Sequence, residues 1–156
     1  MARKLNPEGI IDTETYLFEN HAMYKDSVYT VFEDLVKKNN IPVKISREQM
    51  KSGGFLGSRE EMLVVDGGFK PFVVIGVTTY GNFLSVNYYL LVEDSFFNKM
   101  GAKFTGTALQ NLGYLGKDLI SVRDMQSFSS CVKAVLEDTF NELKFVEFNS
   151  GFFGVK

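Results

Sequence analysis

The stretch that decides the fold is "FVVIGVTTYGNFLSVNYYLLVE", residues 72–93, in which two runs of β-branched and aromatic residues flank Gly81-Asn82. Such residues favour strands, and glycine at the first position of a two-residue loop suits a type II′ turn, whose twist matches that of paired strands. This turn sets Tyr80 opposite Phe83 and thereby the register of both strands. We therefore predict that an antiparallel hairpin forms the centre of a sheet.

Counting outward from the turn assigns each side chain of the hairpin to one of two faces. One face, which pairs Val77 with Val86, is apolar along nearly its whole length. The other face is polar near the turn and apolar near the base, so we expect it to be covered only in part. Its polar end is a candidate surface for a ligand or partner, although a solvated end of a sheet explains the same pattern more simply. The residues of this candidate surface are Tyr80, Asn82, Ser85, Asn87 and Tyr89.

A helical spacing of apolar residues lies on both sides of the strands. Within residues 12–40 it begins with Leu17, His21 and Tyr24, at alternating steps of four and three. This spacing places the side chains on one face of a helix. A second helix is predicted over residues 121–144, and its apolar face comprises Phe128, Val132, Val135, Leu136, Phe140 and Leu143.

Between these two helices the period changes to that of extended chain. Residues 41–46 and 61–66 have the pattern of short strands, separated by a glycine-rich loop over residues 51–60. The tail, residues 145–156, has the pattern of one further strand or a small hairpin. Because the strands cluster between two amphipathic helices, the sequence predicts the α+β class. We expect an antiparallel meander sheet of about four to six strands with two long amphipathic helices packed on one face.

Length and composition point to one globular domain. The chain has 156 residues, of which 45% are hydrophobic and 23% are charged, and a chain of this size can bury a core without a disulfide or metal. We predict a single domain over residues 1–156, in which residues 1–11 form a mobile leader. The net charge of −2, with scattered Lys and Arg, makes nucleic acid an unfavourable partner. The absence of a long apolar run argues against a membrane, and the lone Cys131 favours the cytoplasm.

The residue types that carry catalysis are sparse. His21 is the single histidine, and no carboxylate stands three or four residues from it to orient its ring. We therefore interpret it as a boundary or core histidine. Cys131 falls on the apolar side of the second predicted helix, where a thiol behaves as a small hydrophobic group. One histidine and one cysteine fall short of the usual zinc patterns, so we predict no metal, no cofactor and no catalytic residue.

Two glycine clusters and several acidic pairs also have simple explanations. The segments "SGGFLGS" (residues 52–58) and "LGYLGKD" (residues 112–118) invite comparison with phosphate-binding loops, but neither has the required spacing. We interpret both as flexible loops. Adjacent acids such as Glu33-Asp34 point in different directions, and we interpret them as solvated surface.

These observations favour a non-catalytic, cytoplasmic binding or accessory protein. It would act through a protein partner or through self-association, for example as a homodimer, and the aromatic tail suggests an edge that pairs with another strand. The alternative is a small-molecule-binding protein or hydrolytic enzyme whose site lies between sheet and helices. Such a site would gather residues such as His21, Asp66 or Tyr89 from distant parts of the chain.

Overall fold

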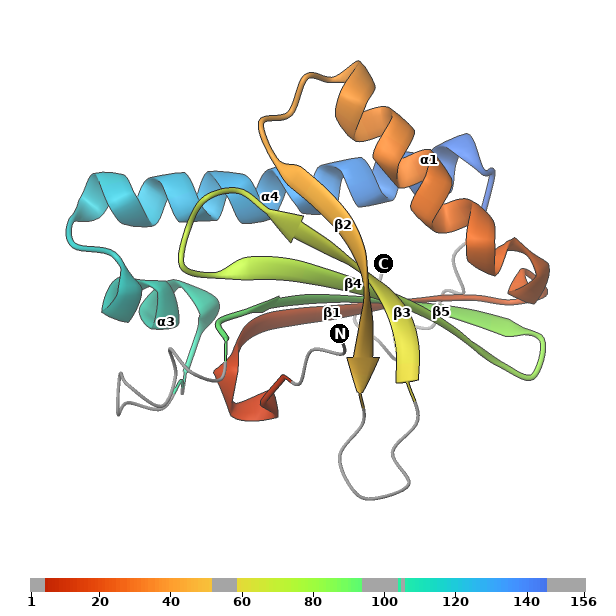
Figure 1. Cartoon of the computed structure of the whole chain (residues 1–156), viewed down its shortest axis with the longest axis horizontal. Coiled ribbons are helices and arrows are strands. Elements are labelled where there is room, and N and C mark those ends of the chain that lie inside the picture. Colours follow the sequence, from red (N-terminus) through yellow and green to blue (C-terminus); the bar gives the residue numbers. More distant parts are fainter. Residues whose placement is uncertain (1–4, 52–58, 94–103, 105, 146–156) are drawn as a thin grey trace.

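A computed structural model describes residues 5–51, 59–93, 104 and 106–145, with Lys51 described for its backbone alone. Short 3-10 turns precede the first strand and the first helix (Figure 1). The elements in chain order are η1 (Pro7–Gly9), β1 (Ile10–Phe18), η2 (Ala22–Tyr24), α1 (Lys25–Lys38), β2 (Lys44–Lys51), β3 (Arg59–Asp66), β4 (Phe72–Tyr80), β5 (Phe83–Leu91), α3 (Ala108–Leu115) and α4 (Leu119–Glu142).

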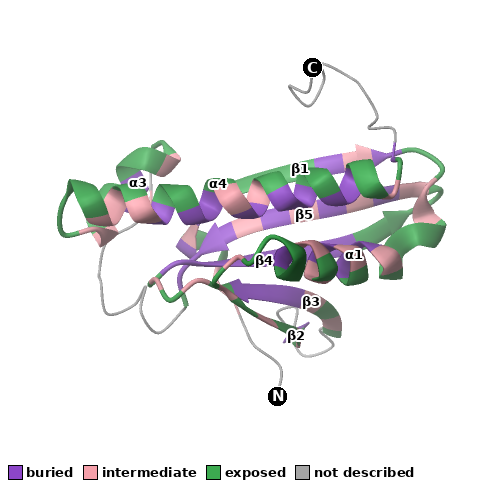
Figure 2. Ribbon diagram, turned by 90° about the horizontal axis from the view of Figure 1, so that it is seen from above, coloured by how far each residue is buried: buried purple, intermediate pink, exposed green. Residues whose placement is uncertain are grey.

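The strands form one antiparallel sheet of five strands in the order β1-β5-β4-β3-β2. Strands β2 to β5 follow one another as a meander, and β1 pairs with the outer side of β5. The helices α1 and α4 lie on one face of this sheet, with α4 along β1 and β5 and α1 over β3 and β4 (Figures 1 and 2). The predicted α+β architecture is confirmed.

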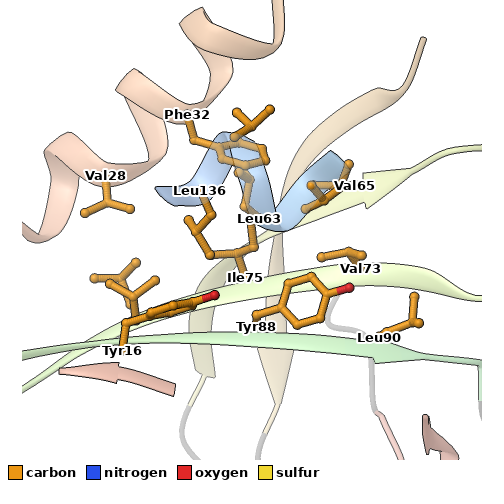
Figure 3. Packing of buried hydrophobic residues seen from close by; sticks show 14 of the residues in the cluster. Tyr16, Val28, Phe32, Leu63, Val65, Val73, Ile75, Tyr88, Leu90 and Leu136 are labelled. Atoms are coloured by element: carbon orange, nitrogen blue, oxygen red, sulfur yellow. The ribbon is translucent and has the colours of Figure 1, made fainter. Parts of the chain in front are cut away.

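The main core fills the space between this face and the two long helices. Phe32 of α1 and Leu136 of α4 point toward Ile75 and Tyr88 of the sheet, and all four are fully buried (Figure 3). Each such side chain contributes on the order of 1.5–3 kcal/mol to folding by leaving water. Apolar burial between the layers therefore holds the helices on the sheet.

The hairpin of β4 and β5 has the register that its turn predicts. Tyr80 pairs with Phe83, and Val77 pairs with Val86. Gly81 has a φ of +62°, while Asn82 does not share a positive φ, as a type II′ turn requires. Both valines are completely buried on the helix side, so the predicted apolar face is confirmed.

The first predicted helix is wrong at its N-terminal end. Residues 10–18 form β1, and the α-helix begins only at Lys25. A left-handed turn at Asn20, with φ +63°, separates the strand from the helix. Pairing with β5 outweighs the local helical spacing because it buries Tyr16 and Phe18, which are 6% and 1% exposed. The leader prediction is wrong for residues 7–11, which belong to η1 and β1.

The segment at residues 112–118 is not a flexible loop. It contains the end of α3, a short turn at Gly116, and Asp118, whose carboxylate accepts a hydrogen bond of 2.8 Å from the Ser121 amide at the start of α4. Sequence analysis missed α3, although Thr107 and Gln110 form a capping box that signals a helix start.

The strand and loop boundaries around β2 and β3 also shift. The second strand spans Lys44–Lys51 instead of residues 41–46, and the third begins at Arg59, inside the predicted loop. The glycine-rich segment at residues 52–58 and nearly all of the predicted C-terminal strand, residues 146–156, lie outside the described residues.

Candidate protein-binding surface

The candidate surface predicted from the hairpin lies mostly on the sheet face turned away from α1 and α4, which we call the open face. Tyr80, Ser85, Asn87 and Tyr89 belong to this face, and Asn82 lies in the turn. Tyr80 is 84% exposed, whereas the other three face residues are half-buried. The structure thus places four of the five predicted residues on one side of the sheet.

Strand β1 extends the open face beyond the hairpin. Thr13 pairs with Tyr89, Thr15 with Asn87 and Leu17 with Ser85. The Thr15 hydroxyl donates a hydrogen bond of 3.0 Å to Oδ1 of Asn87, although the two residues are 72 positions apart. Sequence analysis missed this contribution because it assigned β1 to a helix.

The register also settles which backbone groups of β1 point out of the sheet. The pair that closes a two-residue turn exchanges hydrogen bonds, and bonded pairs then alternate along the ladder. Tyr80 and Phe83 form that pair, so the even-numbered residues of β5 direct their N–H and C=O groups toward β1. Their partners on β1 are its even-numbered residues. The N–H and C=O groups of Thr13, Thr15 and Leu17 therefore point outward, and we call these groups the β1 edge.

Part of this strand's outer side is already occupied. Asn111 of α3 donates its side-chain N–H to the carbonyl of Ile11 at 3.4 Å, at the irregularity between Ile10 and Asp12 where the pairing with β5 shifts. The Asp12 carboxylate accepts the Thr13 amide at 3.0 Å. Among the described residues, nothing hydrogen-bonds to the outward groups of Thr15 and Leu17, and residues 13–15 are exposed (Figure 2).

The opposite edge of the sheet differs in chemistry. Strand β2 carries Lys44, Arg47 and Lys51, and charged residues, lysine above all, discourage the addition of another strand. Arg47 also reaches α1, where its guanidinium donates to the Glu33 carboxylate at 2.9 Å. Strand β1 contains neither lysine nor arginine nor proline. The two edges are therefore unequal, and β1 is the less protected one.

The base of the open face is apolar. A second cluster of buried residues forms there, separate from the main core, and an open pocket of about 250 Å³ lies over it. Tyr89 lines this pocket, where burial and the nearby Glu60 charge raise its pKa. The Met62 side chain fills the space above Gly76, so that a Cβ added at Gly76 would lie 3.2 Å from the Met62 methyl group. The buried members of the cluster are Met50, Val64, Phe72, Val74 and Leu91.

A polar network ties α4 to β1 on the helix side. The Lys133 ammonium lies 2.8 Å from an Asp12 oxygen and 3.4 Å from a Glu14 oxygen. Partial burial lowers the pKa of Lys133, but the hydrogen bond to Asp12 and the Asp12 charge raise it by more, so the pKa lies above its ordinary value. Nearby, the hydroxyls of Tyr88 and Ser129 lie 2.5 Å apart, and burial raises the pKa of Tyr88 to about 12. Sequence analysis missed this network because its members come from three separate elements.

The residues of the alternative, enzyme-like site lie apart. His21 follows β1, where its Nδ1 is 2.6 Å from the Glu19 carbonyl and its ring packs 4.8 Å from Phe145. Asp66 ends β3 and accepts the Gly68 amide at 2.8 Å. Tyr89 is on the open face, so the structure does not gather these three side chains.

Cys131 lines an open pocket of about 330 Å³ between α4 and the turns before β2 and β4. Asp124 and Ser127 also line this pocket. The chain's one histidine lies elsewhere, so neither the thiol nor the Ser127 hydroxyl has an imidazole to activate it.

Within the described ranges, no group of three or more His, Cys, Asp and Glu residues is placed to hold a metal ion. No helix among those ranges is both long enough and apolar enough to span a bilayer. In the comparisons with known proteins, the chain matches neither a family model nor a curated protein.

Proposed function

We propose that this is a non-catalytic binding protein that accepts an extended strand of a protein partner at its β1 edge. The observation that carries the proposal is the outward direction of the N–H and C=O groups of Thr15 and Leu17, on a strand of nine residues, with no hydrogen-bond partner for them among the described residues. A partner strand in this position would gain affinity from backbone hydrogen bonds, as in other cases of strand addition to a sheet edge.

The surroundings of the β1 edge support the proposal. The open-face side chains near it, Leu17 and Asn87, offer an apolar contact and an amide for selecting side chains of the partner. Tyr16 and Phe18 are buried in the core behind β1 and anchor the strand, so the edge is already formed before a partner binds.

The proposal includes a cytoplasmic location, which the single cysteine supports. The alternative of a small-molecule or hydrolytic site between sheet and helices has less support, because the groups that it would use lie apart. Of the candidate surface, Ser85, Asn87 and Tyr89 belong to β5, directly behind β1, where we propose that they contact side chains of the bound strand. Tyr80 on β4 and Asn82 in the turn lie farther from the β1 edge.

A backbone substitution tests the edge directly. Thr15→Pro removes the outward N–H, and proline is tolerated on a strand edge where that group faces solvent. Thr15→Val is the matched control, because it keeps the N–H and the branched side chain while losing the hydroxyl. Short peptides selected from a random library for binding to the wild type would then be measured against both variants by fluorescence anisotropy.

We expect the selected peptides to bind the wild type and Thr15→Val alike and to lose binding to Thr15→Pro, whose melting temperature should stay close to that of the wild type. In the complexes, hydrogen exchange should slow at the amides of Thr15 and Leu17. Equal binding to Thr15→Pro, or a library that yields no binder, would contradict the proposal.

A further inference from the structure

Resting on this proposed function, we infer that the strand accepted by the β1 edge is basic. Its side chains on the α4 side are lysine or arginine. The partner is thus a protein with an extended segment in which every second residue is basic.

The α4 side of the edge is acidic. Asp12 and Glu14 project there from β1, and their side chains are 26% and 47% exposed. Glu137 is exposed one helical turn beyond Lys133, on the side of α4 that faces β1. Lys133 is the one base in this set, so three acids stand against one cation. The flank keeps a net negative charge even after Lys133 has paired with Asp12.

An added strand would bring its side chains to this flank. Paired strands lie about 4.8 Å apart, and successive side chains alternate between the two faces. Every second residue of the added strand would therefore lie on the α4 side, beside Glu14 and near Glu137. Cross-strand neighbours of opposite charge stabilise a pair of strands, whereas like charges destabilise it. A basic side chain fits this flank and an acidic one does not.

The same flank disfavours a second copy of this chain. Two β1 edges paired antiparallel about Thr15 would set Glu14 opposite Tyr16 of the other copy. The two Glu14 carboxylates would then be diagonal neighbours, with Asp12 of each copy close by. This like-charge contact is destabilising. Strand β1 itself contributes no base to this contact, and Lys133 already pairs with Asp12.

Two synthetic peptides of equal length test the inference with the full chain. One alternates lysine with threonine, and the other alternates glutamate with threonine. We expect the lysine peptide to bind roughly tenfold more tightly at low salt, the combined effect of several exposed charge pairs. Its affinity should fall as salt is added.

Substitutions separate the flank from general charge attraction. Glu14→Gln should weaken the lysine peptide a few-fold, and Glu14→Lys should remove or reverse the preference between peptides. Asp34→Asn, an exposed acid on α1, is the matched control and should leave both affinities unchanged. Thr15→Pro should abolish binding of the lysine peptide.

The outcomes distinguish the two proposals. If peptides bind through Thr15 without regard to charge, the proposed function stands and the basic partner is refuted. If the lysine peptide binds Thr15→Pro as well as the wild type, its contact is not the edge and the basic partner is refuted, while the proposed function is decided by the selected peptides. A failure of both peptides to bind also refutes the basic partner. If sedimentation shows a dimer that Thr15→Pro dissociates, a second copy occupies the edge and the inference is overturned.

Discussion

Replacing Tyr29 by phenylalanine tests how the sheet is held where β3 and β4 separate. Their paired residues end at Leu63 and Ile75. Just beyond this point the Tyr29 hydroxyl, from α1, accepts the Val77 amide at 3.2 Å. It also lies 3.1 Å from the Glu61 carbonyl and 3.2 Å from the Ile75 carbonyl, to which it donates. One side chain thus takes the place of the missing strand contacts.

The size of the effect follows from these contacts. Phenylalanine keeps the ring of Tyr29, which is 5% exposed, so little packing is lost. The Val77 amide, however, would be buried without an acceptor, and the Glu61 and Ile75 carbonyls would lose the one O–H that they share. Leaving a buried polar group unsatisfied costs about 1–3 kcal/mol. We therefore expect Tyr29→Phe to lower the free energy of unfolding by about 2–3 kcal/mol.

Urea denaturation followed by circular dichroism measures this loss, with Tyr88→Phe as the matched control. Tyr88 is also a buried tyrosine, but among the described residues its hydroxyl bonds the Ser129 hydroxyl alone. In Tyr88→Phe the Ser129 hydroxyl can instead donate to a backbone carbonyl of α4. The free energy of unfolding should therefore fall by about 1 kcal/mol. A loss below about 0.5 kcal/mol for Tyr29→Phe would refute the reasoning, because Val77 would then have found another acceptor.

Three further predictions concern the sheet and its polar contacts. Val86→Asp should cost more than about 3 kcal/mol, because Val86 is 0% exposed and a carboxylate there would be buried without a partner. Asn87→Asp should cost about 0.5 kcal/mol or less, since the side chain stays on the open face. If thermal melting showed Asn87→Asp to be the more destabilising of the two variants, the β4–β5 register would be wrong by one residue. Burial raises the pKa of Tyr29 and of Tyr88 to about 12 in the folded state, against an ordinary value of 10.0. Above pH 10 the unfolded chain loses these phenolic protons before the folded chain does. The free energy of unfolding should therefore fall between pH 10 and 12 by roughly 2–3 kcal/mol for each of the two tyrosines. A urea midpoint that stays constant over this pH range would contradict the prediction. Lys133→Met should cost about 1–3 kcal/mol by leaving two neighbouring carboxylates without their cation, and an unchanged melting temperature would show that the network adds nothing.

Local rules predict those elements whose determinants lie within one short segment. The register of the β4–β5 hairpin follows from Gly81-Asn82, because a two-residue turn leaves one way to count outward. The helix over residues 121–144 was predicted to within two residues of α4 at either end, because its buried face repeats over many turns. The capping box at Thr107 would have located α3 by the same kind of local argument.

The candidate surface was predictable in part. The period of two along a strand suffices to group Tyr80, Ser85, Asn87 and Tyr89 on one face. It does not indicate which face the helices cover or which strand lies beside β5. The strand that completes the surface was instead assigned to a helix, because Leu17, His21 and Tyr24 happen to have a helical spacing.

The sequence by itself determined the α+β class, the hairpin register and the apolar face of α4, since each depends on contacts between residues close in the chain. Only the tertiary structure decided that residues 10–18 are a strand, that this strand stands at the edge of the sheet, and that Lys133 meets Asp12. The physical reason is that β1 gains its hydrogen bonds and its buried area from β5 and α4, far away in sequence. That long-range gain outweighs the local preference of the segment, and it leaves Thr15 and Leu17 with their backbone groups turned outward.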